Sequence, residues 1–83
     1  MQFTVYVLYS VGYDKIYVGY TSDLESRLRS HNELSTKGWT IKFRPWNLVH
    51  YEIFESKTLA LKREKELKSY QGRLFIRNVI LKQ

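Results

Sequence analysis

The chain has 83 residues, which leaves room for one domain spanning residues 1–83 and none for a second. It contains no cysteine, which excludes disulfide bridges and thiolate zinc sites and fits a reducing compartment. No apolar run approaches the ~20 residues of a membrane span, and residues 1–10 lack the basic start and long apolar core of a signal peptide. We therefore expect a cytoplasmic protein with no membrane partner.

The net charge of +6 lies entirely at the C-terminal end of the sequence. Residues 1–56 balance their Lys and Arg against Asp and Glu, whereas residues 57–83 set their Lys and Arg against only Glu64 and Glu66. A one-sided basic surface suits a polyanion such as DNA, and solubility explains the charge equally well. If DNA is the partner, we expect it to contact Lys62, Arg63, Lys65 and Arg73. Lys15 and Lys37 should then matter less.

An antiparallel hairpin is predicted at the start of the chain. Phe3–Tyr9 alternates strictly, which is typical of a strand, and Lys15–Tyr20 is a second segment rich in β-branched and aromatic residues. The alternation places Phe3, Val5, Val7 and Tyr9 on one face and Thr4, Tyr6 and Leu8 on the other. The short connection containing Gly12 favours a tight antiparallel pairing of the two strands.

A helix is predicted next. Ser22 and Glu25 have the spacing of a capping box, with Ser22 as the N-cap. The helix should run to about Asn32, with Leu24 and Leu28 as its apolar seam.

The rest of the chain predicts a strand and two helices. Residues 33–44 contain little pattern and are interpreted as a loop before a third strand, Asn47–Phe54. Ser56 can cap a helix that ends at about Lys68, Gly72 interrupts, and a third helix should cover Arg73–Leu81. The order ββα–β–αα predicts an α+β domain, a small three-stranded antiparallel sheet flanked by three helices.

Two pairs of residues are candidates for chemistry near the N-terminus. If Tyr6 lies opposite Tyr17 in the hairpin, both phenols stand on one face of the sheet, although strands are commonly rich in tyrosine. Arg27 and His31 are four residues apart, so they are neighbours on one helix face. Arg27 can clamp a phosphate and His31 can move a proton near neutral pH. A solvated pair is the ordinary alternative.

Glu64 and Glu66 are the only carboxylates in the basic third of the chain. A carboxylate among basic residues can hold Mg²⁺, which keeps most of its waters and takes few protein ligands. Intrahelical pairs of Glu64 with Lys68 and of Glu66 with Lys62 are the structural alternative. Both glutamates flank the apolar stripe of the helix, so periodicity does not choose between them.

Asn78 is predicted to lie on an apolar face of the third helix, between the directions of Leu74 and Phe75. A buried amide without partners costs about 1–3 kcal/mol, so this side chain must find some. It either anchors backbone or orients a group in a site, and the sequence favours neither.

The ordered motifs of the chain resemble the GIY-YIG nuclease superfamily, in particular its small stand-alone members related to the nuclease domain of bacterial excision repair. The matching residues are Val5-Tyr6, Tyr17-Val18-Gly19, Thr21, Asp23-Leu24, Arg27, His31-Asn32, Arg44-Pro45-Trp46, Glu52, Ala60 and Arg63-Glu64-Lys65. Each motif is weak alone, and the ordered set is specific. Thr4 replaces the first Gly of the family name and Val18 replaces an Ile.

The resemblance implies roles for individual residues. Tyr6 and Tyr17 correspond to the tyrosines of the first and second motifs, Arg27 to the phosphate-contacting arginine and His31 to the helix histidine. Glu64 corresponds to the metal-binding glutamate, which implies Mg²⁺ or Mn²⁺ as cofactor. The implied activity is that of a metal-dependent endonuclease that hydrolyses DNA phosphodiester bonds in repair or processing.

The implied mechanism is attack of water on a phosphodiester. Tyr6 or Tyr17, helped by His31, would deprotonate the water. Because an unperturbed tyrosine pKa is about 10, we expect Arg27 and the metal to lower the pKa of the tyrosine that acts as base. Asn78 corresponds to a late asparagine of the family that orients Tyr6 or the phosphate.

A non-catalytic nucleic-acid-binding module is the alternative interpretation of the same basic surface. Aromatic residues that could stack on unpaired bases are Tyr13, Tyr20, Trp39 and Trp46, with Trp46 better explained as core. With no appended recognition domain, specificity for DNA is expected from DNA shape, from a homodimer or from a partner protein.

Overall fold

A central antiparallel sheet organises the fold. The computed structural model describes residues 1–83. The three strands are β1 (Phe3–Ser10), β2 (Lys15–Thr21) and β3 (Asn47–Phe54), in the spatial order β2-β1-β3. Both neighbours of β1 run antiparallel to it, so β1 is the only strand paired on both edges.

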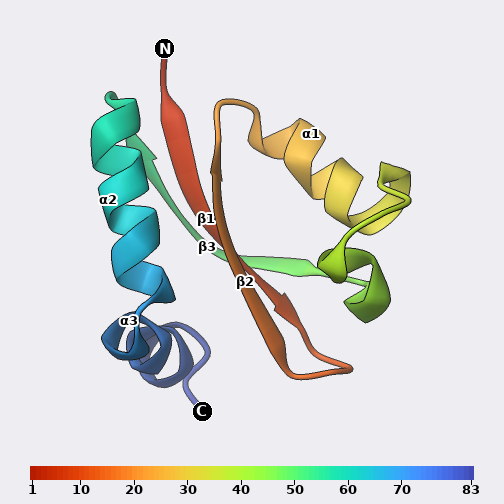
Figure 1. Ribbon diagram of the computed structural model, residues 1–83. Helices are drawn as coiled ribbons and strands as arrows, with labels where there is room; N and C mark the ends of the chain where they lie inside the picture. The colour runs from red at the N-terminus through yellow and green to blue at the C-terminus, as the bar shows by residue number, and fades with distance from the viewer.

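Helices cover the two faces of this sheet (Figure 1). The helix α1 (Leu24–Arg29) lies on one side, and α2 (Lys57–Lys68) and α3 (Tyr70–Phe75) lie on the other. The predicted α+β class, with a three-stranded antiparallel sheet and three helices, is confirmed. None of the helices has the length and the apolar character needed to cross a membrane.

Strand β1 contributes alternate residues to two different clusters. Val5 and Val7 enter an apolar core that also contains Val18, Ala60, Leu67 and Ile76. Tyr6 and Leu8 point the other way and cluster with Trp46, under the side chains of α1. The alternation expected from the sequence therefore separates an apolar side of the sheet from a side that carries tyrosine.

The register of the hairpin differs in detail from the expected one. Tyr6 lies opposite Gly19, and Tyr17 lies opposite Leu8. Because Tyr6 and Leu8 are two positions apart on one strand, Tyr6 and Tyr17 still share a face, as diagonal neighbours rather than as a direct pair.

The first helix begins and ends differently from the prediction. Asp23, not Ser22, is the N-cap, and its carboxylate accepts a hydrogen bond from the Ser26 amide. A π-helical segment, Ser30–Leu34, continues α1 past the predicted end. The region interpreted as loop also contains a 3₁₀ helix, Trp39–Phe43.

The C-terminal helices confirm one predicted boundary and correct another. Ser56 caps α2 as expected, with its hydroxyl accepting from the Leu59 amide. Helix α3 starts before the predicted Arg73, because Ser69 acts as its N-cap and accepts from the Gly72 amide. Gly72 therefore lies within the helix, where a Cβ would overlap the backbone of Glu66 and Leu67. Because glycine has no Cβ, α2 and α3 can approach each other closely at this position.

Candidate active site

A buried chain of polar side chains lies on the α1 side of the sheet. The Tyr6 hydroxyl is 3.0 Å from Nε2 of His31, and Nδ1 of the same imidazole is 3.1 Å from the Thr40 hydroxyl. The three residues are only 1%, 5% and 8% exposed, respectively. We call Tyr6, His31 and Thr40 the polar chain. It links the middle of β1 to α1's π-helical extension and to the 3₁₀ helix.

Gly19 makes room for the first member of the polar chain. A Cβ built at Gly19 would lie 2.7 Å from the Tyr6 hydroxyl oxygen and 3.1 Å from the Tyr17 ring. The Tyr6 phenol therefore lies across β2 at a point where only glycine leaves space.

The segment that carries His31 is braced by its neighbours. The Asn32 side chain pairs with the Trp46 backbone, accepting from its amide at 2.6 Å and donating to its carbonyl at 3.0 Å. The Trp46 indole donates to the Thr40 carbonyl at 2.8 Å. The Arg44 guanidinium donates to the backbone carbonyls of Ser30, His31 and Ser35. These contacts fix the two outer members of the polar chain relative to each other.

Tyr17 and Arg27 stand beside the polar chain at a solvent-accessible cavity. The Tyr17 ring centroid is 4.7 Å from that of His31 and 6.2 Å from that of Tyr6. A cavity of about 230 Å³, which we call the α1 cavity, is lined by residues that include Tyr17, Arg27, His31, Trp39 and Thr40. The structure thus brings together three of the predicted catalytic side chains in one cavity, with Tyr6 directly behind them.

The charges around the polar chain decide its protonation at neutral pH. Burial raises the pKa of Tyr6 to about 12, although the nearby Arg27 opposes this. Burial lowers the pKa of His31, and the positive charges of Arg27 and Arg44 add to that effect. Tyr6 is therefore protonated and His31 is neutral at pH 7. Arg27 acts on Tyr6 in the expected direction, but desolvation of the phenolate is the larger effect, so the net pKa of Tyr6 is raised rather than lowered.

This protonation state gives the polar chain a direction. The neutral imidazole has one donor and one acceptor nitrogen. The Tyr6 O–H can donate to Nε2, which leaves the imidazole proton on Nδ1, directed at the Thr40 hydroxyl. On the cavity side, interaction with the Tyr6 hydroxyl raises the pKa of the Arg27 guanidinium further above its usual value, so Arg27 stays charged.

Glu64 differs clearly from Glu66. Its side chain is only 17% exposed, and its carboxylate lies 3.6 Å from Lys68, whereas Glu66 is exposed. The charge of Glu64 is close enough to Tyr6 to contribute to the raised tyrosine pKa. No group of three His, Cys, Asp or Glu side chains gathers anywhere in the structure. A single carboxylate fits Mg²⁺, which is often held by one or two carboxylates together with water and substrate phosphate.

The chain matches the profile of the GIY-YIG catalytic domain over residues 2–76. It belongs to the GIY-YIG family. A UPF0213 protein of Haloquadratum walsbyi is 44% identical over 57 residues, which are 69% of this chain and 64% of that protein. A UPF0213 protein of Staphylococcus aureus is 42% identical over 55 residues, covering 66% of this chain and 67% of that one. The match thus spans just under two thirds of the first relative's own length.

A solved structure supports the fold of this GIY-YIG domain. The solution NMR structure of a UPF0213 protein from Bacillus halodurans superimposes with a TM-score of 0.57 at 28% identity. The superposition covers 95% of this chain and 85% of that one. The domain is therefore a small GIY-YIG domain that is similar to UPF0213 proteins.

The predicted position of Asn78 in the GIY-YIG domain is wrong. Asn78 is exposed, on a π-helical segment (Ile76–Ile80) that continues α3. Leu74 and Phe75, which were expected to mark the apolar face, are themselves 38% and 36% exposed, and Ile76 and Ile80 face the apolar core instead. This core lies on the side of the sheet away from Tyr6, so the structure does not bring Asn78 to the α1 cavity.

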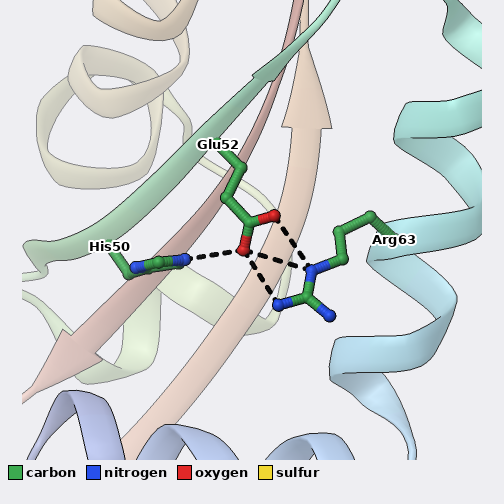
Figure 2. A network of polar contacts seen from close by, with 3 residues as sticks. All are labelled: His50, Glu52 and Arg63. Atoms are coloured by element: carbon green, nitrogen blue, oxygen red, sulfur yellow. Dashed lines mark hydrogen bonds and ion pairs between the residues drawn. The ribbon is translucent and has the colours of Figure 1, made fainter.

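The basic residues of the GIY-YIG domain that are expected to contact DNA differ in their surroundings. Arg63 binds Glu52 through both oxygens, with its Nε 3.0 Å from Oε1 and its Nη2 3.0 Å from Oε2 (Figure 2). His50 approaches the same carboxylate at 2.8 Å, and the two partners hold the Glu52 pKa below its usual value even though burial opposes them. Arg63 is therefore committed to an ion pair that links β3 to α2.

Three of these basic residues line one hollow and the fourth lines another. Lys62, Arg63 and Lys65 line a cavity of about 570 Å³ with Phe75. Arg73 lines a different groove of about 370 Å³ together with Lys15 and Tyr17. Sequence periodicity on α2 and α3 could not distinguish these positions, because their surroundings depend on how the helices pack on the sheet.

Proposed function

We propose that this GIY-YIG domain is a divalent-metal-dependent endonuclease that hydrolyses DNA phosphodiester bonds. The observation that carries the proposal is the meeting of Tyr17, Arg27 and His31 in the α1 cavity, directly over buried Tyr6. The family match supplies the class of chemistry, and the geometry supports it because a guanidinium, an imidazole and a phenol share one small space.

The role of each residue in the proposed reaction follows from how exposed its side chain is. Arg27 contacts a phosphate oxygen and stabilises the negative charge that grows on it during attack. Tyr17, at the cavity surface, contacts the attacking water, whereas Tyr6 is too buried and too weakly acidic to ionise. Tyr6 and Thr40 instead hold the His31 ring in place by hydrogen bonds, beside Tyr17 at the cavity. Mg²⁺ or Mn²⁺ held by Glu64 would supply further charge stabilisation at the phosphate.

The biological setting is part of the proposal. A DNA substrate would give the domain a role in DNA repair or processing, in the cytoplasm. The domain is small, so a homodimer or a partner protein would supply substrate specificity.

The test compares Glu64→Gln with Glu66→Gln as a matched control on the same helix. Plasmid, single-stranded, flap and branched DNA are incubated with each protein in Mg²⁺, Mn²⁺ or EDTA. Wild type and Glu66→Gln should cleave at least one substrate, only with metal. Glu64→Gln should cleave more slowly by orders of magnitude, since metal stabilisation is worth several kcal/mol and each 1.4 kcal/mol is about tenfold.

Three results would contradict the proposal in whole or in part. Cleavage by Glu64→Gln at the wild-type rate, or loss of cleavage in Glu66→Gln alone, would remove Glu64 from the metal site. Binding of DNA by wild type with no cleavage of any substrate would favour a non-catalytic nucleic-acid-binding module.

A further inference from the structure

A groove lies next to the α1 cavity along strand β2. It has a volume of about 370 Å³ and is lined by residues that include Lys15, Tyr17, Trp39, Lys68 and Arg73. Tyr17 and Trp39 line both this β2 groove and the α1 cavity, so the two hollows share a wall. A chain molecule with a phosphate in the α1 cavity therefore has a continuous path into the β2 groove.

The β2 groove carries positive charge that the protein itself does not neutralise. Two of its cations already have carboxylate partners, since Lys68 lies 3.6 Å from Glu64 and Arg77 lies 2.8 Å from Asp14. Lys15 and Arg73 have none: Arg73 donates only to the Lys68 carbonyl, and Lys15 lies over the Phe43 ring. Both cations are exposed, and both are free to bind an anion.

Trp39 presents an aromatic face at the wall between the two hollows. Its ring is supported from within, with centroids 4.7 Å from Phe43 and 5.8 Å from Trp46. It nevertheless remains 47% exposed. An aromatic ring that is held on one side and open on the other is suited to stacking on a flat heterocycle.

We propose that the β2 groove binds the nucleotides that flank the scissile phosphate, in a strand whose bases are unpaired. Lys15 and Arg73 bind its phosphates, and Trp39 stacks on one of its bases, which is accessible only outside a duplex. The inference rests on the proposed nuclease function. It also changes the set of residues expected to contact DNA. Lys15 is added to that set, and Lys62 and Lys65 are removed from it.

The first test neutralises charge in matched pairs. Binding of a fluorescent single-stranded oligonucleotide is measured by anisotropy in EDTA over a range of salt. Lys15→Gln/Arg73→Gln should lower the slope of log affinity against log salt by about 1.4, because each phosphate contact to a single strand contributes about 0.7. Lys62→Gln/Lys65→Gln, which removes the same charge, should leave the slope close to that of wild type. Equal slopes for the two double variants would overturn the proposal.

The second test concerns the stacking platform. Trp39→Ala should weaken single-strand binding about 5- to 150-fold, the range expected for loss of one stacked base. Trp39→Phe should retain most of the affinity, and blunt duplex DNA should bind both variants and wild type alike. Matching thermal unfolding curves would show that the variants are folded. Unchanged single-strand affinity in Trp39→Ala, or an equal loss for duplex, would overturn the proposal.

These measurements test binding in the β2 groove separately from the proposed nuclease activity. Both are made in EDTA and need no cleavage. If the groove variants lose binding while no DNA is ever cleaved, the nuclease proposal is wrong and single-strand binding in the β2 groove is supported. If DNA is cleaved and the groove variants bind normally, the groove proposal is wrong and the nuclease proposal is supported.

Discussion

The two sides of the sheet are stabilised in different ways, although both begin at β1. On the α2 side, Val5 and Val7 pack against Ala60, Leu67 and Ile76, all fully buried. On the α1 side, Tyr6, His31 and Thr40 are almost as buried but are polar. Apolar burial stabilises wherever area is removed from water, whereas a buried polar group stabilises only while its partner is present. The α2 side of the sheet should therefore tolerate imprecise packing better than the α1 side tolerates the loss of a hydrogen bond.

The largest effect is expected from a cavity in the apolar core. Leu67→Ala should lower the free energy of unfolding by about 2–5 kcal/mol, because buried leucine contacts are lost and a cavity remains. The measurement is equilibrium unfolding in urea. Leu59→Ala on the same helix is the control, since Leu59 is 52% exposed and should matter far less. Similar losses in the two variants would mean that α2 is not packed as described.

Tyr6→Phe tests the α1 side of the sheet by removing only the hydroxyl group that bonds His31. The variant leaves Nε2 of buried His31 without a partner, which should cost about 1–3 kcal/mol of unfolding free energy. Tyr9→Phe, on the same strand, removes an exposed hydroxyl that bonds Asp14 and should cost less than about 1 kcal/mol. If Tyr9→Phe proves the more destabilising of the two, the polar chain is not a structural element of the domain.

Thr40→Val tests the far end of the polar chain. Loss of the hydroxyl should cost about 1 kcal/mol of stability and should change the tautomer of His31, because Nδ1 then lacks its partner. Imidazole nitrogen chemical shifts report the tautomer directly. Thr40→Ser should restore the wild-type shifts. A tautomer that is the same in Thr40→Val as in wild type would show that Thr40 does not orient the imidazole.

The smallest effect is the pH dependence of stability. The pKa of folded His31 is lowered by burial, so the unfolded chain binds the proton more readily. Stability should therefore fall as pH drops below about 6.5, with a slope of at most ~1.4 kcal/mol per pH unit for one proton. Urea unfolding at several pH values should show this slope in His50→Gln, which keeps only His31. The slope between pH 6.5 and 5 should disappear in His31→Gln/His50→Gln, which keeps neither histidine.

Local pattern was sufficient for much of this domain. Strand alternation separates the Tyr6 face from the Val5 face, and hydrophobic spacing with capping residues locates the helices. The ordered motifs added the residues of the α1 cavity, whose roles remain proposals. Thr40 could not be found in this way, because it lies in a segment without periodicity and becomes buried only through contacts with His31 and Trp46.

The differences between prediction and structure share one physical cause. The 3.6-residue period predicts the apolar face of the third helix at Leu74 and Phe75, but the packed domain leaves both of them and Asn78 exposed. The basic residues were placed on one surface because the charge is contiguous in sequence, yet the packing of α2 and α3 on the sheet sends Lys62 and Arg73 to different hollows. Arg63 is expected at the DNA surface because of its charge, and the sequence does not show that Glu52, on another element, is its ion-pair partner. Each error concerns tertiary geometry that a single sequence does not contain.

The contact between Gly19 and the Tyr6 phenol makes the two family motifs a single unit. What the fold requires is a tyrosine on one strand and a glycine facing it across the hairpin, not a fixed number of residues between them. Lengthening the turn after Ser10 would change the spacing in the sequence and leave the pair intact. Distant relatives with long hairpins could therefore be recognised by a paired-position search, in which tyrosine and glycine are scored together and the intervening length is left free.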